Sequence, residues 1–209
     1  EDLKKLVRPL LVGPFTVSDY SAIEARLTAW AAGEDSVLES FRNGEDIYVA
    51  TAERMGGAKA GFDRQRGKSA TLGCGFGGGA GALLNLGGAK IYPKGTPDDV
   101  IWAGLTSLVE TWRVAHPHIV SWWKQVHTAF DKGGPASRRI PVDVEIVGND
   151  RYVWLPSGRA LVYHNCRREY VQPKDRNGKP LPYRRRAWVC DAVVGNGTQR
   201  RIVGGPTQV

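Results

Sequence analysis

The sequence is poor in cysteine and contains no long apolar run. Its three cysteines are odd in number and include no Cys-x-x-Cys pair. This excludes a disulfide framework and argues against a structural zinc site. No stretch approaches the ~18 apolar residues needed to cross a bilayer, so we expect no membrane partner. The chain begins at Glu1 without an apolar signal core, and together these absences favour a reducing, cytoplasmic compartment.

Positive charge is abundant but confined to the last third of the chain. The 209 residues carry a net charge of +8 and are 42% hydrophobic, which argues against a wholly disordered chain. Residues 1–150 carry a net charge of −1, whereas residues 151–209 hold 12 basic and 3 acidic side chains. A basic block of this size indicates a polyanionic partner such as a nucleic acid. A solvated basic face without a partner explains it equally well.

The first part of the chain predicts a strand followed by a helix. The β-type run 15–17 is expected to be a strand that leads into Asp19. Ser21 and Glu24 have the spacing of a capping box, which would open a helix. Apolar residues recur at helical spacing beyond it, and Gly33 should end that helix.

Five more segments have helical periodicity, and they cover residues 37–44, 46–55, 63–72, 96–112 and 117–133. Asp46 and Asp63 are predicted to cap the second and third segments, and Thr96 the fourth, with Pro97 at its first helical position. In the third segment Arg64, Lys68 and Leu72 are four residues apart, so they lie on one helix face.

From Pro141 the apolar pattern changes to a period of two, which is typical of strands. Residues 152–155 and 160–163 flank a Pro-Ser-Gly turn and predict a hairpin, and Asn177-Gly178 and Asn196-Gly197 predict two further turns. The sequence therefore predicts a mixed α/β (α+β) fold with a helical middle and a β-rich, basic end.

Asp19 and two basic residues are the first candidates for chemistry. An aspartate at a strand end can offer its oxygens to a hard cation such as Mg²⁺, although a turn aspartate is the commoner explanation. Arg64 and Lys68 would either clamp a triphosphate or form the solvated face of a helix. Phe76 lies among glycines, where its ring could stack on a base. The glycine-rich stretch 73–88 follows a basic helix and lacks Gly-Lys-Ser/Thr, so it is neither a dinucleotide fingerprint nor a P-loop.

Two motifs in sequence order resemble family A DNA polymerases, the bacterial DNA polymerase I type. The first resembles motif A of that family and reads Asp19-Tyr20-Ser21-Ala22-Ile23-Glu24-Ala25-Arg26. The second resembles motif B, on the fingers helix, and consists of Arg64, Lys68, Phe76 and Gly77. The connecting residues 41–47 are also similar to the family. The match covers roughly residues 6–80, and parts of the later sequence look like phage-encoded members.

The resemblance implies catalytic and metal-binding roles for the first motif. Asp19 would be one of two aspartates that hold a pair of Mg²⁺ ions, and the backbone carbonyl of Tyr20 would assist it. Tyr20 and Ser21 would also lie beside the bound nucleotide. Glu24 would be the steric gate that excludes a ribose 2′-hydroxyl.

The resemblance implies nucleotide binding for the second motif. Arg64 and Lys68 would be catalytic cations that hold the incoming triphosphate, and Tyr48, Leu72 and Phe76 would line the rest of the nucleotide site. Tyr48 replaces a histidine of bacterial members, and Leu72 replaces an aromatic residue. The DNA itself would be bound by four further residues, Gly77 and the basic triplet Arg184, Arg185 and Arg186.

The largest departure from the family is an absence. Motif C of the family, a His-Asp-Glu sequence on a palm hairpin, does not occur in the chain. Asp191 is the nearest candidate for the second aspartate, and we expect it to be an ordinary strand or turn residue. The chain is therefore expected to be an internal fragment, with a palm part at 1–45, helical fingers at 46–135, and a β-rich basic segment at 136–209 that returns to the palm.

The leading hypothesis is a DNA-directed DNA polymerase of phage type that adds deoxynucleoside monophosphates to a primer 3′ end. Its partners would be primer–template DNA, deoxynucleoside triphosphates and the remaining polymerase segments, in the host cytoplasm if a phage encodes it. A catalytically incomplete nucleic-acid-binding module is the first alternative. A single-subunit RNA polymerase is the second, and Glu24 at the gate position argues against it.

Overall fold

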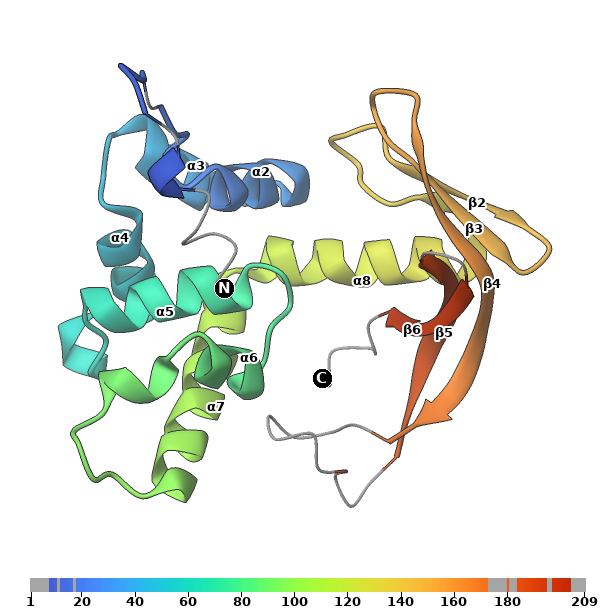
Figure 1. The fold of residues 1–209 in the computed structure, drawn as a ribbon. Helices are drawn as coiled ribbons and strands as arrows, with labels where there is room; N and C mark the ends of the chain where they lie inside the picture. The colour runs from blue at the N-terminus through green and yellow to red at the C-terminus, as the bar shows by residue number, and fades with distance from the viewer. Residues whose placement is uncertain are drawn as a thin grey trace.

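The chain folds into a helical part and an antiparallel sheet that a single long helix joins (Figure 1). The computed structural model describes residues 8–10, 12–16, 18–172, 180, 184–194 and 197–203. The mixed α/β class predicted from the sequence is confirmed. None of the helices in these ranges combines the length and the hydropathy that a membrane crossing requires.

Six of the seven α-helices in the described residues follow predicted segments, whereas the helix Ala80–Asn85 lies in the glycine-rich stretch, where no helix was predicted. Their bounds are α2 (Ile23–Ala32), α3 (Asp35–Arg42), α4 (Ile47–Arg54), α5 (Arg64–Cys74), α6 (Ala80–Asn85), α7 (Asp98–Ala115) and α8 (Pro117–Lys132), with short 3-10 turns at Arg8–Leu10, Ala58–Ala60 and Gly88–Ile91. Asp46 and Asp63 cap α4 and α5 as predicted, because their carboxylates accept backbone N–H bonds of the first turn. Gly33 ends α2 in the left-handed conformation.

Three local predictions are wrong. Phe15 and Thr16 are irregular rather than a strand, because no described strand lies beside them to complete their hydrogen bonds, and Val17 lies outside the described residues. Ala22, with φ +50°, is the N-cap of α2, so Ser21 lies one residue too early to form a capping box. Pro97, not Thr96, is the N-cap of α7, because the Thr96 hydroxyl donates to the Pro93 carbonyl (2.8 Å) in the preceding turn.

Helix α7 forms the centre of the main core. Leu105, Leu108 and Trp112 are almost completely buried, and they pack with Leu83 of α6 and Cys74 of α5. Each buried leucine contributes about 2–3 kcal/mol of apolar transfer free energy. The core therefore fixes α5, α6 and α7 relative to one another.

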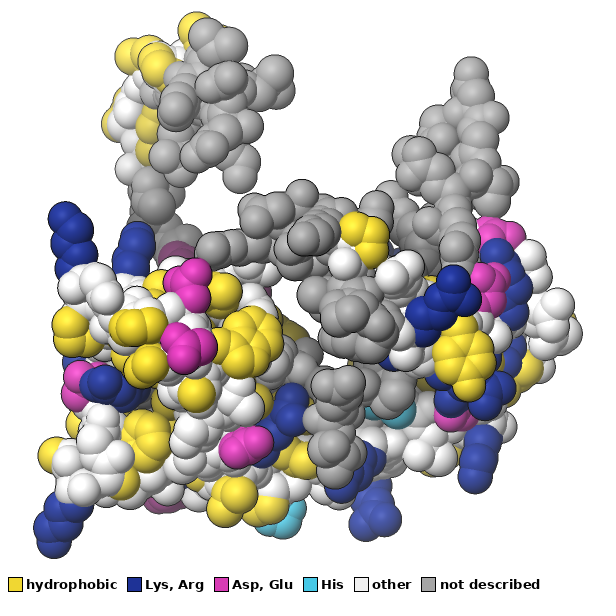
Figure 2. Space-filling model, turned by 90° about the horizontal axis from the view of Figure 1, so that it is seen from below, with side chains coloured by type: hydrophobic (Ala, Val, Ile, Leu, Met, Phe, Trp, Pro, Cys, Tyr) yellow, Lys and Arg dark blue, Asp and Glu magenta, His cyan; other side chains and the backbone are white. Residues whose placement is uncertain are grey.

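Helix α2 has its larger apolar side chains on its exposed face. Ile23, Leu27 and Trp30 are 37%, 52% and 48% exposed, while the smaller Thr28 and Ala29 are buried. Small side chains let α2 approach α8 and α3 closely, which leaves the large ones in solvent. Figure 2 shows hydrophobic side chains spread over the helical side of the molecule, with Lys and Arg side chains on both the helical side and the sheet side.

The sheet contains six strands in sequence order, each antiparallel to the next. The strands are β1 (Gly134–Pro135), β2 (Asp143–Val147), β3 (Asp150–Trp154), β4 (Ala160–Val171), β5 (Arg185–Val194) and β6 (Gly197–Val203). The hairpin predicted around residues 156–158 is confirmed between β3 and β4. The predicted turn at 177–178 lies outside the described residues, as does Asn196, although Val194 pairs with Gly197 on either side of it.

The end of α8 is attached to the sheet by polar contacts. Asp131 accepts hydrogen bonds from the Trp188 indole (2.6 Å) and from the Arg168 guanidinium. Phe130 packs edge-on against Trp188, with 5.6 Å between the ring centroids. These contacts place β4 and β5 beside the last turn of the helix.

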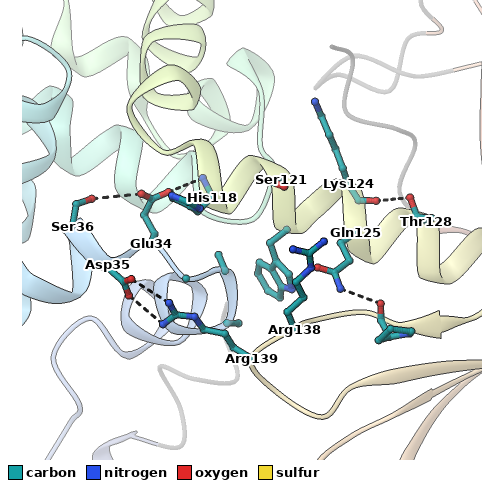
Figure 3. A pocket seen from close by; sticks show the side chains of 15 residues that line it. Glu34, Asp35, Ser36, His118, Ser121, Lys124, Gln125, Thr128, Arg138 and Arg139 are labelled. Atoms are coloured by element: carbon teal, nitrogen blue, oxygen red, sulfur yellow. Dashed lines mark hydrogen bonds and ion pairs between the residues drawn. The ribbon is translucent and has the colours of Figure 1, made fainter.

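The start of α8 is capped by a residue far away in the sequence. Glu34, buried between α2 and α3, accepts hydrogen bonds from the backbone N–H groups of His118 (3.0 Å) and Ile119 (3.3 Å), as Figure 3 shows for His118. A carboxylate at a helix N-terminus also interacts favourably with the helix dipole. Glu34 therefore joins the α2–α3 connection to α8.

We expect Glu34→Ala to lower the free energy of unfolding by about 2 kcal/mol, because the part-buried N–H group of His118 and the buried N–H group of Ile119 lose their acceptor. Urea denaturation measures this change. Glu39→Ala is the matched control, because Glu39 forms only an exposed ion pair with Arg42 and should change stability by less than about 0.5 kcal/mol. An equal effect of the two substitutions would show that the Glu34 cap contributes nothing.

Candidate functional site

Helices α4 and α5 bring three of the predicted site residues together. The Arg64 guanidinium carbon lies 5.2 Å from the centre of the Tyr48 ring, and the Lys68 ammonium lies 5.9 Å from the same centre. Both cations therefore lie within cation–π distance of the same aromatic ring. Arg64 is exposed and Lys68 is half-buried, so their charges remain accessible to a ligand.

Gly67 is the reason that α4 and α5 can approach this closely. A Cβ atom added at Gly67 would lie 2.0 Å from the backbone carbonyl oxygen of Tyr48 and 3.1 Å from the Ala52 nitrogen. No side chain fits there, so only glycine permits the contact. Its position between Arg64 and Lys68 makes the helix contact part of the same site.

Asp46 links the two helices a second time. One carboxylate oxygen accepts the N–H groups of Tyr48 (2.9 Å) and Val49 (3.3 Å), and the other accepts Nε of Arg64 (2.7 Å). The hydrogen bond from Arg64 is the main reason that the pKa of Asp46 is lowered, so the carboxylate is ionised at neutral pH. Among the described residues Arg64 makes this bond through Nε alone, so its two terminal nitrogens can pair with another acceptor.

Two further residues of the predicted nucleotide site, Leu72 and Phe76, follow Arg64 and Lys68 along the chain. Leu72 is 50% exposed, and Phe76, just beyond the helix end, is 68% exposed. Gly77 adopts φ +78°, and its N–H donates to the Cys74 carbonyl (2.9 Å). This left-handed turn ends the helical path and leaves the Phe76 ring in solvent.

The residues of the first motif form an exposed segment. Asp19, Tyr20 and Ser21 are exposed ahead of α2, and Glu24 is exposed in its first turn. Among the described residues neither Asp19 nor Glu24 has a hydrogen-bond or ion-pair partner. Ala22 of this segment and Tyr48 of the Tyr48–Arg64–Lys68 cluster pack against the same buried residues, Ala29, Val37 and Ile47.

The basic triplet does not form one surface. Arg185 and Arg186 lie opposite Val171 and Tyr170 in β5, so their side chains point to opposite faces of the sheet. Arg184 and Arg186 are exposed, whereas Arg185 is half-buried and lines a large groove. The three side chains therefore do not form one continuous basic surface.

Asp191 is part of a polar network in the sheet. Its carboxylate accepts hydrogen bonds from the Asn165 amide (2.7 Å) and from Arg167 (3.0 Å), and these bonds lower its pKa. Asp191 lies in β5, which agrees with the prediction of a strand aspartate. In the described ranges no three His, Cys, Asp or Glu side chains cluster as metal ligands would.

His116 and the cysteines have structural environments. The His116 ring stacks on Trp112 with 4.2 Å between the centroids, and burial lowers its pKa to about 4. The three cysteines are free and buried, and burial raises the pKa of Cys74 to about 12. A neutral imidazole and protonated thiols suit a packed interior.

Sequence reasoning missed two functional features of this region. Asp46 has a helix-capping signal, which says nothing about its second bond to Arg64, 18 residues away. Gly67 lies inside a helical pattern, where a glycine signals either a weakness of the helix or a close approach of another segment. The glycine at position 67 was therefore a signal in the sequence that another segment approaches the helix closely.

Comparison with known proteins connects the chain to DNA polymerases. It is 36% identical over 177 residues to the DNA polymerase of Bacillus phage SP02, which covers 77% of this chain and 26% of that protein. It is 25% identical over 132 residues to the DNA polymerase of Mycobacterium phage D29, and this match covers 60% of the present chain and 20% of the phage protein. It is 29% identical over 123 residues to DNA polymerase I of Lactococcus lactis, and this match covers 56% of the present chain and 13% of the bacterial protein. No family model matches the chain.

The chain is therefore a relative of phage and bacterial DNA polymerases. It spans about a quarter, or less, of the length of the curated relatives that it matches. The similarity to the phage SP02 protein covers most of the chain, so it includes much more than the short motifs.

Proposed function

We propose that the chain is the nucleotide-binding part of a template-directed DNA polymerase of the family A type, acting in DNA replication. The observation that carries the proposal is the placement of Arg64 and Lys68 beside the same aromatic ring, that of Tyr48, with both cations open to a ligand. The phage and bacterial relatives support it at the general level. The reaction would transfer a deoxynucleoside monophosphate to a primer 3′ end.

The α4–α5 cluster would bind the triphosphate of the incoming nucleotide. Phosphoryl transfer is catalysed mainly by positioning and by neutralising charge on the phosphate oxygens. A guanidinium and an ammonium one helical turn apart supply that charge, and Arg64 still has its two terminal nitrogens free to pair with phosphate oxygens. Leu72 and Phe76 would extend the site along α5 toward the sugar and the base.

The first motif would supply the remaining parts of the site. An exposed carboxylate such as Asp19 is a suitable donor for Mg²⁺, which binds one or two carboxylates and substrate phosphates. When bound, the metal pair would stabilise the attacking and leaving oxygens. Tyr20 and Ser21 would adjoin the nucleotide, and Glu24, which has no capping bond, would be free to act as the gate. Motif C of the family does not occur in the chain, so we propose that the second carboxylate lies in another polymerase segment.

The exposed apolar face of α2 also supports the proposal that other polymerase segments complete this part of the protein. Ile23, Leu27 and Trp30 form a stripe that other polymerase segments would cover. The assignment of residues 1–45 to the palm, 46–135 to the fingers and 136–209 to a segment returning to the palm remains part of the proposal. The proposal also includes DNA contacts at Gly77 and at the basic triplet Arg184, Arg185 and Arg186.

Primer extension tests the proposed function. The protein is incubated, in its full-length context, with a labelled primer–template, Mg²⁺ and the four deoxynucleotides. We expect extension in the order that the template dictates. Binding of the primer–template without any extension would contradict the proposal and favour a nucleic-acid-binding module, the alternative that the absence of motif C from the chain supports.

We expect Asp46→Asn to raise the KM for deoxynucleotides about fivefold with little change in kcat. Asparagine caps a helix as well as aspartate does, so α4 should persist while Arg64 loses its ionic tether. Fivefold corresponds to the ~1 kcal/mol of a part-exposed ion pair. Steady-state incorporation kinetics measure the change, and Asp63→Asn, which alters the cap of α5 in the same way, is the control. Equal KM values for the two variants would show that the tether does not position Arg64.

A further inference from the structure

One exposed arginine connects the segment before α2 to the neighbouring helix α3. Arg26 lies in the first turn of α2, and its Nε donates a hydrogen bond to the backbone carbonyl of Ser21 (3.0 Å). Its guanidinium carbon lies 4.0 Å from the centre of the Phe41 ring in α3, well within the range of a cation–π contact. A single guanidinium group therefore holds the backbone before α2 against a side chain of α3.

The Ser21 carbonyl accepts this side chain because the backbone changes direction at the next residue. Ala22 has φ +50° and ψ +40°, in the left-handed region that residues other than glycine rarely adopt. The N–H of Arg26 donates to the Ala22 carbonyl (3.1 Å). Within the described ranges no backbone N–H reaches the carbonyl of Ser21, so the Arg26 side chain supplies its donor.

The other side of this connection rests on the small core between α2, α3 and α4. Phe41 and Ala22 are partly buried against this core, and so is Tyr48. Tyr48 is also the ring that lies beside Arg64 and Lys68. The segment held by Arg26 and the cation cluster of α4 and α5 therefore share one support.

We propose that Arg26 is a positioning residue for Asp19. Asp19 has no hydrogen-bond or ion-pair partner among the described residues, so the backbone determines where its carboxylate lies. By fixing the Ser21 carbonyl, two residues further on, Arg26 sets the place of that carboxylate relative to the cations of α5. This role rests on the proposed function, which makes Asp19 a metal ligand, and Arg26 itself would touch neither metal nor nucleotide.

The test is single-nucleotide incorporation by the full-length protein, with deoxynucleotide and Mg²⁺ varied separately. We expect Arg26→Ala to lower kcat about tenfold, which is less than the hundredfold that a misplacement of about 1 Å can cost. The Mg²⁺ concentration that gives half the maximal rate should rise, because a displaced carboxylate is a poorer ligand. The KM for deoxynucleotides should stay the same, since the cations of α5 are untouched.

Variants of the ring and of the guanidinium show whether the two groups act together. Phe41→Leu removes the aromatic face and should cause a similar loss, and the double variant with Arg26→Ala should be no slower than the slower single variant. Arg26→Lys keeps the charge but replaces the planar group with a compact ammonium, so it should show most of the loss. Arg42→Ala is the matched control, because Arg42 is an exposed arginine next to Phe41 that pairs with Glu39, and it should incorporate at the wild-type rate.

Several results would overturn this role of Arg26. Wild-type kcat and Mg²⁺ dependence in Arg26→Ala would do so, as would full activity of Arg26→Lys. A raised KM for deoxynucleotides at unchanged kcat would show that Arg26 contacts the nucleotide itself. Additive losses in the double variant would show that Phe41 and Arg26 act separately.

Backbone hydrogen exchange at residues 18–26, measured by mass spectrometry without nucleotide or metal, separates this role from the proposed function. We expect faster exchange there in Arg26→Ala and Phe41→Leu but not in Arg42→Ala, because the first two release the segment. If this pattern appears and the wild type extends no primer, the proposed function fails while the hold on the segment stands. If the wild type extends primers and the variants change neither exchange nor incorporation, the role of Arg26 fails and the polymerase proposal stands.

Discussion

Replacing Asp19 with asparagine is expected to reduce primer extension about a thousandfold while primer–template binding stays the same. In the proposed site Asp19 provides a carboxylate ligand for Mg²⁺, and an amide is a neutral and weaker ligand for a hard cation. Loss of one preorganised electrostatic group at a reacting phosphate costs about a hundred- to a thousandfold in rate. The side chain is exposed and makes no described contact, so the fold should not change.

Single-turnover incorporation and DNA binding, measured on the same preparation, distinguish the two effects of this change. Asp63→Asn is the control, because Asp63 caps α5 and asparagine keeps that cap. Extension by the Asp19→Asn protein at the wild-type rate would remove Asp19 from the catalytic site. Loss of DNA binding together with extension would indicate a role in binding instead.

Replacing Gly67 with alanine is expected to destabilise the protein by about 3 kcal/mol and to disrupt nucleotide binding. The new methyl group would lie 2.0 Å from the Tyr48 carbonyl oxygen, so α4 and α5 must separate. Overpacking of this kind costs about 1–3 kcal/mol, and here the obstacle is backbone, which moves less readily than a side chain. Separation would also remove Tyr48 from beneath Arg64 and Lys68.

Urea denaturation and nucleotide-dependent extension measure the two consequences of Gly67→Ala. Gly81→Ala is the matched control, since Gly81 is also helical and an added Cβ there would meet only Trp102 at an ordinary 3.8 Å. Alanine should be neutral or slightly stabilising at that position. If Gly67→Ala were as stable and as active as Gly81→Ala, the close helix contact would have no part in the site.

The predicted site was found largely because its residues are close in sequence. Arg64, Lys68 and Leu72 share a helix face by their spacing alone, and the structure keeps them there. The placement of Tyr48 beneath the two cations depends on Gly67 and on the packing of α4, which no spacing rule contains. The groove beside Phe76 is also lined by Trp102 and Arg185, which are far apart in the sequence.

The sequence by itself determined the elements whose signals are local. Asp46 and Asp63 cap their helices because a cap acts within one turn, the α7 stripe is buried because its spacing matches the helix, and the hairpin around residues 156–158 follows from its turn. Tertiary structure decided the rest. The run at residues 15–17 needed a neighbouring strand, Glu34 became the cap of α8 across 84 residues, and Asp46 acquired Arg64 as a partner. Such contacts depend on how whole elements pack, because their free energy arises only when distant segments meet.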